Sequence, residues 1–294
     1  MPTYKGRSVI SGMVVQEAMR CVVNRINVYS SIESCIQKMI RQKSNAVLAE
    51  TDDGKPVGVV SKTDIINAYY AALPVHTPVS DILSKSPYFC NPSDKLDMAL
   101  DLMIKNKIHR IYIREKNDDV IGTLSYSDIV GLLYRYCRKC EKGKRNPGDL
   151  ENRNLPRLMV NDVMTSGLIF CDVNDRIIDV IETLFERRLG AVLVKNGVDA
   201  IGVISKTDLI ISYGHGQNQE INASNIITMP VLSCSSDILL SEAVQKMFIH
   251  DVQRLFVSDH TDNIIGVISL SDAAKARSGT CKACAASVLL EGVS

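Results

Sequence analysis

Apolar and polar positions alternate with two different periods along this chain, and the same order of periods occurs four times. Each copy has a short strand-like run, an amphipathic helix, two strands and a turn into a second helix. In the first helices, apolar residues recur three or four positions apart, which places them on one face. These apolar stripes, which we expect in the core, are Ile32, Ile36, Met39 and Ile40; Leu96, Ala99, Leu100 and Met103; Ile177, Ile181, Leu184 and Phe185; and Leu240, Ala243, Val244 and Met247.

The segments after each first helix predict a pair of strands joined by a turn. The strand candidates lie at 46–48, 110–113, 191–194 and 254–257, and the turn candidates at 52–54, 117–119, 196–197 and 261–263. The chain is therefore expected to be an α/β protein built from four β-α-β-β-α repeats.

Each repeat ends in the same seven-residue pattern, Gly-h-h-Ser-x-x-Asp, where h is apolar. The four copies are GVVSKTD at 58–64, GTLSYSD at 122–128, GVISKTD at 202–208 and GVISLSD at 266–272. Their aspartates are separated by 128 − 64 = 64, 208 − 128 = 80 and 272 − 208 = 64 residues. Two pairs offset by 144 residues indicate that a pair of repeats has been duplicated.

The serine and aspartate of this motif allow two compatible interpretations. A serine at a strand-to-helix junction can cap the helix, and an aspartate at the third helical position interacts favourably with the helix dipole. The same helix start presents unpaired N–H groups that can bind an anion. A neighbouring aspartate can also accept hydrogen bonds from two ribose hydroxyls.

This repeat, with its terminal motif, resembles the CBS domain, and two such repeats resemble one Bateman module. The resemblance covers about 15–276, and four repeats are organised similarly in proteins such as the γ subunit of AMP-activated protein kinase. It implies a first module at 12–140 with repeats 1 and 2, and a second at 158–284 with repeats 3 and 4. The charged segment 141–157, which contains Pro147-Gly148, is then the linker.

The same resemblance implies AMP or ATP in clefts between paired repeats, with the aspartate on the ribose and the serine near phosphate. Repeats 2 and 4 add His109-Arg110 and Gln253-Arg254, and arginine offers a planar fork of donors to phosphate oxygens. Because Gln253 carries no charge, we expect the two modules to differ in affinity or ligand. Ser61 resembles a residue that the partner repeat donates to the repeat 2 site. The expected nucleotide-binding residues are Asp128, Ser125, Ser127, His109, Arg110, Ser61, Asp272, Ser269, Ser271, Arg254, Gln253, Ser205, Asp64 and Asp208.

Two Cys-x-x-Cys pairs stand nine residues beyond the aspartates of repeats 2 and 4. They are Cys137 with Cys140 and Cys281 with Cys284. Four thiolates brought together would form a tetrahedral site for zinc, iron or an iron–sulfur cluster. Surface thiols, a bridge in a dimer and redox exchange are alternative interpretations. The other cysteines, which we expect to be buried or half-buried, are Cys21, Cys35, Cys90, Cys171 and Cys234.

The amino-acid composition argues against nucleic-acid binding and against a membrane-spanning segment. The 34 Lys and Arg residues nearly balance 33 Asp and Glu, which disfavours a nucleic-acid binder that needs a basic excess. No apolar run approaches the ~20 residues that span a bilayer, and single cysteines in apolar segments are typical of a reducing compartment, so we expect a cytoplasmic protein.

No nucleophile with a histidine partner and no Gly-rich phosphate loop is evident, so we expect no enzyme activity. The sequence favours a regulatory sensor of AMP, ADP or ATP that acts on an unknown client protein. The alternative is a metal-based or iron–sulfur redox sensor or scaffold that uses the cysteine pairs. Whether the chain forms a homodimer is left open.

Overall fold

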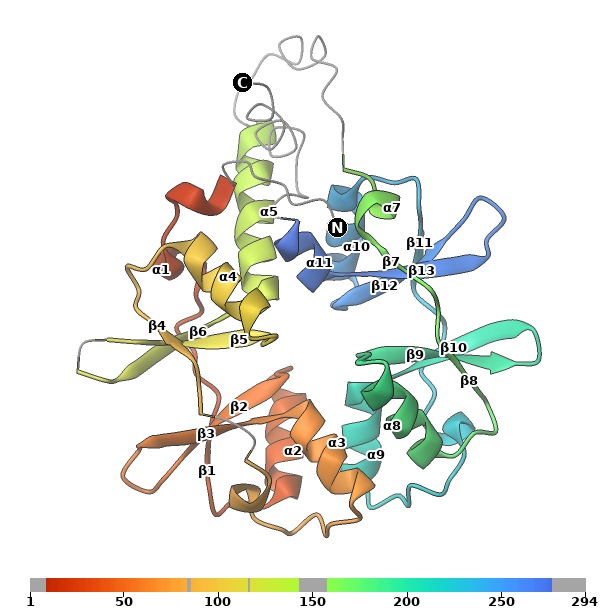
Figure 1. Cartoon of the computed structure of the whole chain (residues 1–294), viewed down its shortest axis with the longest axis horizontal. Helices are drawn as coiled ribbons and strands as arrows, with labels where there is room; N and C mark the ends of the chain where they lie inside the picture. Colours follow the sequence, from red (N-terminus) through yellow and green to blue (C-terminus); the bar gives the residue numbers. More distant parts are fainter. Residues whose placement is uncertain (1–8, 84–85, 116, 143–157, 277–294) are drawn as a thin grey trace. The chain divides into compact units, whose positions relative to one another are not determined.

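The computed structural model describes residues 9–83, 86–115, 117–142 and 158–276, and gives only the backbone of 136–142 (Figure 1). The described chain divides into two compact units that do not follow chain order. One contains repeats 1 and 3 (23–87 and 168–231) and is called the 1/3 unit below. The other contains repeats 2 and 4 and is called the 2/4 unit.

The 1/3 unit holds two three-stranded sheets, β1-β2-β3 and β10-β9-β8. Repeat 1 consists of β1 (Arg25–Asn27), α2 (Ile32–Arg41), β2 (Ala46–Glu50), β3 (Pro56–Ser61), α3 (Lys62–Tyr70) and the 3₁₀ turn η2 (Val79–Ile82). Repeat 3 consists of β8 (Phe170–Asp172), α8 (Ile177–Glu186), β9 (Ala191–Asn196), β10 (Asp199–Ser205), α9 (Lys206–Gly214) and η3 (Ala223–Asn225). In each sheet the first two strands are parallel and the last two form an antiparallel hairpin.

The 2/4 unit repeats this arrangement and adds the segments that precede repeats 1 and 3. Repeat 2 has β4 (Phe89–Cys90), α4 (Leu96–Lys105), β5 (Arg110–Arg114), β6 (Val120–Ser125) and α5 (Tyr126–Lys142), packed with η1 (Val9–Gly12) and α1 (Val15–Ala18). Repeat 4 has β11 (Ser233–Ser235), α10 (Leu240–Ile249), β12 (Arg254–Ser258), β13 (Ile264–Ser269) and α11 (Leu270–Lys275), with α7 (Val160–Val163) and β7 (Thr165–Ser166) before it. Here β7 adds a fourth strand, giving the order β11-β12-β13-β7.

The predicted α/β architecture of four β-α-β-β-α repeats is confirmed. The four predicted turns also form: each hairpin contains a residue in the left-handed region, with φ of +77° at Gly54, +66° at Asp118, +64° at Gly197 and +62° at Asp262. Glycine, or a short polar side chain, adopts this conformation most readily.

Each unit has one apolar core, made largely of the predicted helix stripes. Two stripe residues depart from the prediction: Ile40 is 40% exposed and Phe185 is only partly buried. Met39 already completes the buried face of α2, and Ile40 lies a further 100° around the helix, on its solvent side. Cys21, expected to be at least half-buried, is exposed, whereas Cys35, Cys90, Cys171 and Cys234 are buried.

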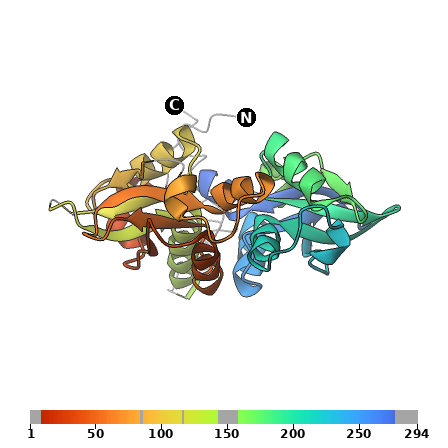
Figure 2. The same ribbon diagram turned by 90° about the horizontal axis from the view of Figure 1, so that it is seen from below.

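The second helices of the repeats pack in pairs. In the 1/3 unit α3 lies against α9, and in the 2/4 unit α5 lies against α11 (Figures 1 and 2). The rings of Tyr69 and Tyr213 stack between α3 and α9, with centroids 4.8 Å apart and planes 12° apart. Because each second helix begins at a repeat motif, this packing associates the motif of repeat 1 with that of repeat 3, and repeat 2 with repeat 4.

The module boundaries, the linker and the cysteine pairs are not tested by the described residues. The modules 12–140 and 158–284 pair repeats that belong to different units, so this pairing stays a prediction. Linker residues 143–157 and the pair Cys281 and Cys284 lie outside the described residues, as do the side chains of Cys137 and Cys140. Within the described part of the chain, no helix combines the length and apolarity needed to cross a membrane.

Candidate functional site

The motif aspartate accepts two hydrogen bonds from the motif serine at the start of the second helix in every repeat. In repeat 1, Asp64 Oδ2 accepts hydrogen bonds from the Ser61 backbone N–H at 2.7 Å and from the Ser61 hydroxyl at 2.6 Å. The same two bonds join Asp128 to Ser125, Asp208 to Ser205 and Asp272 to Ser269. In repeats 1, 3 and 4 the serine hydroxyl also accepts a hydrogen bond from a backbone N–H of the first helical turn, which confirms the capping interpretation there. The aspartate uses only one carboxylate oxygen for its bonds to serine.

The second oxygen of these aspartates, Oδ1, meets different partners. Asp128 Oδ1 forms an ion pair with the Arg20 guanidinium, and Asp208 Oδ1 accepts a hydrogen bond from the Thr228 hydroxyl at 2.9 Å. For Asp64 and Asp272, Oδ1 has no hydrogen-bond partner among the residues that the structure describes. The carboxylates thus present one oxygen to the cap and one away from it.

Arg20 and Thr228 occupy equivalent places on their sheets. Arg20 exchanges two backbone hydrogen bonds with Thr123 in β6, at 2.8 and 2.9 Å, and Thr228 exchanges two with Val203 in β10, both at 2.9 Å. In repeat 4, Thr165 pairs in the same way with Val267 of β13. In each case a segment runs antiparallel to the last strand, and in repeats 2 and 3 it brings a side chain against the motif aspartate.

This close approach explains the glycine that opens the motif. A Cβ at Gly122 would lie 2.7 Å from the Arg20 carbonyl oxygen, and one at Gly202 would lie 2.7 Å from that of Thr228. At Gly266 the corresponding distance to Thr165 is 2.8 Å. These separations are too short for any side chain, so glycine is needed for the incoming segment to pair.

Repeat 2 gathers most of the predicted phosphate-binding groups around the start of α5. Arg110 stands opposite Ser125 in the register of β5 and β6. The His109 ring meets the Tyr126 ring edge-on, with centroids 5.5 Å apart. The hydroxyls of Ser125 and Ser127 are 2.9 Å apart. Positive and hydroxyl groups therefore surround the helix start that holds Asp128.

Repeat 4 has the same arrangement, with Gln253 in the place of His109. Arg254 stands opposite Ser269 across β12 and β13. Burial lowers the pKa of Arg254, and the nearby Asp272 carboxylate partly counteracts that shift. The Gln253 carbonyl accepts a hydrogen bond from the first N–H of α11, at 3.0 Å, which places this residue against the helix start.

Repeats 1 and 3 place a lysine immediately after the cap serine. Lys62 Nζ donates to the Thr207 hydroxyl at 2.8 Å, and Lys206 Nζ donates to the Thr63 hydroxyl at 2.8 Å. These reciprocal bonds join the two motifs of the 1/3 unit. The prediction missed these lysines and threonines, although the Ser-Lys-Thr-Asp sequence occurs only in repeats 1 and 3. It also missed Arg20 and Thr228, which lie outside the motif.

Tyr112, two positions after Arg110, carries a hydroxyl where the other three repeats have an apolar side chain. The corresponding residues Leu48, Leu193 and Phe256 are apolar. The Tyr112 hydroxyl is buried without a hydrogen-bond partner in the part of the chain described, and burial raises its pKa to about 12. Repeat 2 thus differs from the other three repeats at this position of β5 as well as at its motif.

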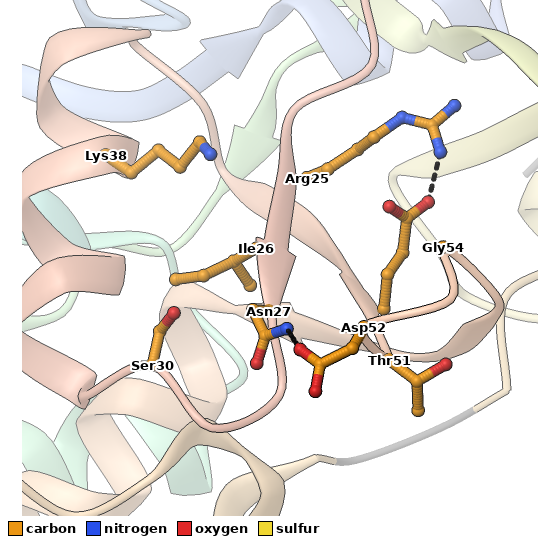
Figure 3. A pocket seen from close by; sticks show the side chains of 9 residues that line it. Arg25, Ile26, Asn27, Ser30, Lys38, Thr51, Asp52 and Gly54 are labelled. Atoms are coloured by element: carbon orange, nitrogen blue, oxygen red, sulfur yellow. Dashed lines mark hydrogen bonds and ion pairs between the residues drawn. The ribbon is translucent and has the colours of Figure 1, made fainter.

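A pocket of charged side chains opens at the end of β1 in repeat 1 (Figure 3). Arg25 forms an ion pair with Glu50, and the Asn27 amide donates to Asp52 at 2.6 Å. Lys38 also lines the pocket. None of the predicted nucleotide-binding residues lines it. Ser61 lies instead in its own cap with Asp64, and its donation to the repeat 2 site stays a prediction.

Metal ligation by the cysteine pairs stays a prediction as well, because those side chains are outside the described part of the chain. Among the residues that are described, no group of three or more His, Cys, Asp or Glu side chains is placed to hold a metal ion.

Comparison with known proteins identifies the repeats. The model of the CBS domain family matches 15–71, 79–135, 160–214 and 223–279, together more than half of the chain. In the curated relatives, identity is 25% over 160 residues with uncharacterized protein MJ1404 of Methanocaldococcus jannaschii, covering 53% of this chain and 37% of that protein. It is 25% over 198 residues with human 5′-AMP-activated protein kinase subunit gamma-3, covering 62% and 38%. The chain therefore spans well under two thirds of the length of both.

A solved structure shares the fold. Protein MJ1225 from Methanocaldococcus jannaschii superposes with a TM-score of 0.73 at 16% identity, covering 90% of this chain and 99% of that chain. A conserved protein from Pyrococcus horikoshii has a TM-score of 0.58 at 16% identity, covering 90% and 100%.

Proposed function

Because the chain belongs to the CBS-domain family, we propose that it is a non-catalytic regulatory protein that binds adenine nucleotides at its repeat motifs. The observation that carries this proposal is the second oxygen, Oδ1, of each motif aspartate, which the bonds to the motif serine leave unused. Asp128 uses Oδ2 for its cap with Ser125, which fixes the carboxylate and leaves Oδ1 directed away from the helix. A carboxylate held in this way can accept hydrogen bonds from vicinal ribose hydroxyls.

Repeat 2 has the most complete set of groups for a nucleotide phosphate. The start of α5 offers backbone N–H groups and the hydroxyls of Ser125 and Ser127. Arg110, opposite Ser125, adds a guanidinium that can bind two phosphate oxygens at once. The similarity to a subunit named for 5′-AMP-activated protein kinase supports AMP as the first ligand to test.

Regulation requires that the ligand prefer one conformation. A nucleotide that binds two conformations equally well shifts nothing, however tightly it binds. We infer that occupancy of the motif sites changes the affinity of the chain for a client protein.

The test is calorimetric titration of the full chain with AMP and ATP, comparing Asp128→Asn with Asp208→Asn. Each variant weakens an equivalent cap and one further contact of Oδ1, with Arg20 in repeat 2 and with Thr228 in repeat 3. We expect Asp128→Asn to weaken the tightest AMP-binding event at least tenfold, a change of about 1.4 kcal/mol, while Asp208→Asn leaves it unchanged.

Arg110→Ala provides a second variant at the same site. It leaves the cap intact and is expected to weaken AMP more than adenosine, because it removes a phosphate donor. If the AMP titration is the same in wild type, Asp128→Asn and Arg110→Ala, the assignment of the repeat 2 site is wrong.

A further inference from the structure

In repeat 2 the oxygen that the proposed function assigns to ribose already has a partner. Arg20 Nε donates to Asp128 Oδ1 in a direct ion pair. The Asp128 side chain is 4% exposed and is fixed by Ser125, whereas the Arg20 side chain is 68% exposed. The carboxylate is therefore immobile, and the guanidinium can turn away into solvent.

The other three repeats carry a hydroxyl at this place. The equivalent segments of the sequence read VQEAMR at 15–20, VSDILS at 79–84, VNDVMT at 160–165 and ASNIIT at 223–228. Their last residues are Arg20, Ser84, Thr165 and Thr228, and Ser84 lies outside the described residues. Thr228 donates to Oδ1 of Asp208, just as Arg20 donates to Oδ1 of Asp128. The residue at this position therefore determines the partner of the second carboxylate oxygen.

We propose that Arg20 is a specificity-determining residue of the repeat 2 site, which makes that site discriminate against nucleosides that carry no phosphate. The proposal rests on the proposed function. In the empty site Arg20 occupies Asp128 Oδ1, and ribose hydroxyls must displace it to bind there.

The penalty for displacing Arg20 depends on the ligand. Adenosine replaces a charge-assisted hydrogen bond with neutral ones and gives the released guanidinium no anionic partner. AMP supplies a phosphate that the released guanidinium can bind, together with Arg110. A threonine at this position forms no ion pair to be broken, so the other repeats lack this discrimination.

Arg20→Thr is the direct test, since it installs the residue that repeats 3 and 4 carry. Arg20 also pairs with Thr123 through its backbone, and threonine retains this pairing. Titrations of the full chain with adenosine and with AMP give the two dissociation constants for wild type and variant. We expect adenosine to bind about two- to fivefold more tightly in Arg20→Thr, and AMP to bind more weakly, so the preference for AMP falls by up to about tenfold.

The double variant Arg20→Thr/Asp128→Asn, compared with Asp128→Asn alone, assigns the effect to this ion pair. In this comparison Arg20→Thr must no longer increase adenosine affinity, because no charged carboxylate remains to be released. If wild type binds AMP and Arg20→Thr keeps the same preference for AMP over adenosine, the inference is overturned while the proposed function stands. If neither wild type nor variant binds AMP or adenosine, the proposed function itself fails.

Discussion

The two units use the same repeats but join them with different chemistry. In the 1/3 unit, the residues after the cap serines are Lys62 and Lys206, which donate reciprocally to threonines of the opposite motif. In the 2/4 unit the same positions hold Tyr126 and Leu270, each 5% exposed and part of the apolar core. One position in a repeated motif thus adds hydrogen bonds between the repeats in one unit and apolar burial in the other.

This difference has energetic consequences. A hydrogen bond between protein groups replaces hydrogen bonds to water, so the net contribution of each lysine bond is about 1–2 kcal/mol. Burial of Tyr126 and Leu270 contributes in proportion to the apolar area removed from water. The joint of the 1/3 unit should therefore depend on its other apolar contacts, which include the stacked pair Tyr69 and Tyr213.

Tyr213→Ala is expected to have the largest effect on the comparison. Tyr213 is 4% exposed, stacks on Tyr69, and donates its hydroxyl to the Leu73 carbonyl at 2.6 Å. Loss of a buried aromatic side chain lowers the free energy of unfolding by about 3–5 kcal/mol. Amide hydrogen exchange should show faster exchange in α3 and α9 but not in α5 and α11.

Tyr213→Phe is the matched control for the stacking. It keeps the ring and removes only the bond to Leu73, so we expect a loss of about 1 kcal/mol. Equal losses for the two variants would show that the hydrogen bond, not the stacked ring, holds α9 against α3. Faster exchange throughout both units would show that the two joints are not independent.

The Lys–Thr bond gives a smaller and more specific effect. A double-mutant cycle with Lys62→Met and Thr207→Val should reveal a coupling energy of about 1 kcal/mol in denaturant unfolding, because these side chains bond directly. The equivalent positions of the 2/4 unit are Tyr126 and Ser271. A cycle with Tyr126→Phe and Ser271→Ala should give coupling near zero. Similar coupling in both cycles would remove the distinction between the joints.

The fold was predictable because its information is local and repeated. Four copies of one apolar pattern predicted the helix stripes, and the turns at 52–54 and 196–197 followed from glycine and polar residues. The errors arose where a local period does not decide exposure. Ile40 follows Met39 in the apolar run of α2, but it lies beyond the buried face of the helix. Cys21 is exposed, and it directly follows Arg20, which forms a single bridge with Thr123 of β6.

The site was predictable only within the motif. Ser61 and Asp64 are three residues apart, so their cap can be inferred from helix geometry alone. Arg20 and Asp128 are 108 residues apart, and Lys62 and Thr207 are 145 apart. Such pairs depend on strand register and helix packing. Comparing equivalent positions, where arginine replaces serine or threonine, was the available signal for Arg20.

Thiol labelling gives the smallest effect and reports on each unit separately. Burial raises the pKa of the Cys35 thiol in the 1/3 unit to about 12, and that of Cys90 in the 2/4 unit to about 11. At pH 8, well below both values, each folded thiol is neutral, and only the thiolate reacts with iodoacetamide. Both cysteines should therefore be labelled much more slowly than the exposed Cys21.

Combining this labelling with Tyr213→Ala tests whether the two joints respond separately. Cys35 packs in the same core as Tyr213, whereas Cys90 belongs to the core of the 2/4 unit. If the polar joint opens by itself, peptide mass spectrometry should show faster labelling of Cys35 and an unchanged rate at Cys90, with Cys21 as the internal reference. Equal acceleration at both buried cysteines would mean that a change at one joint is transmitted to the other. The chemistry after the cap serine would then not determine the stability of each unit separately.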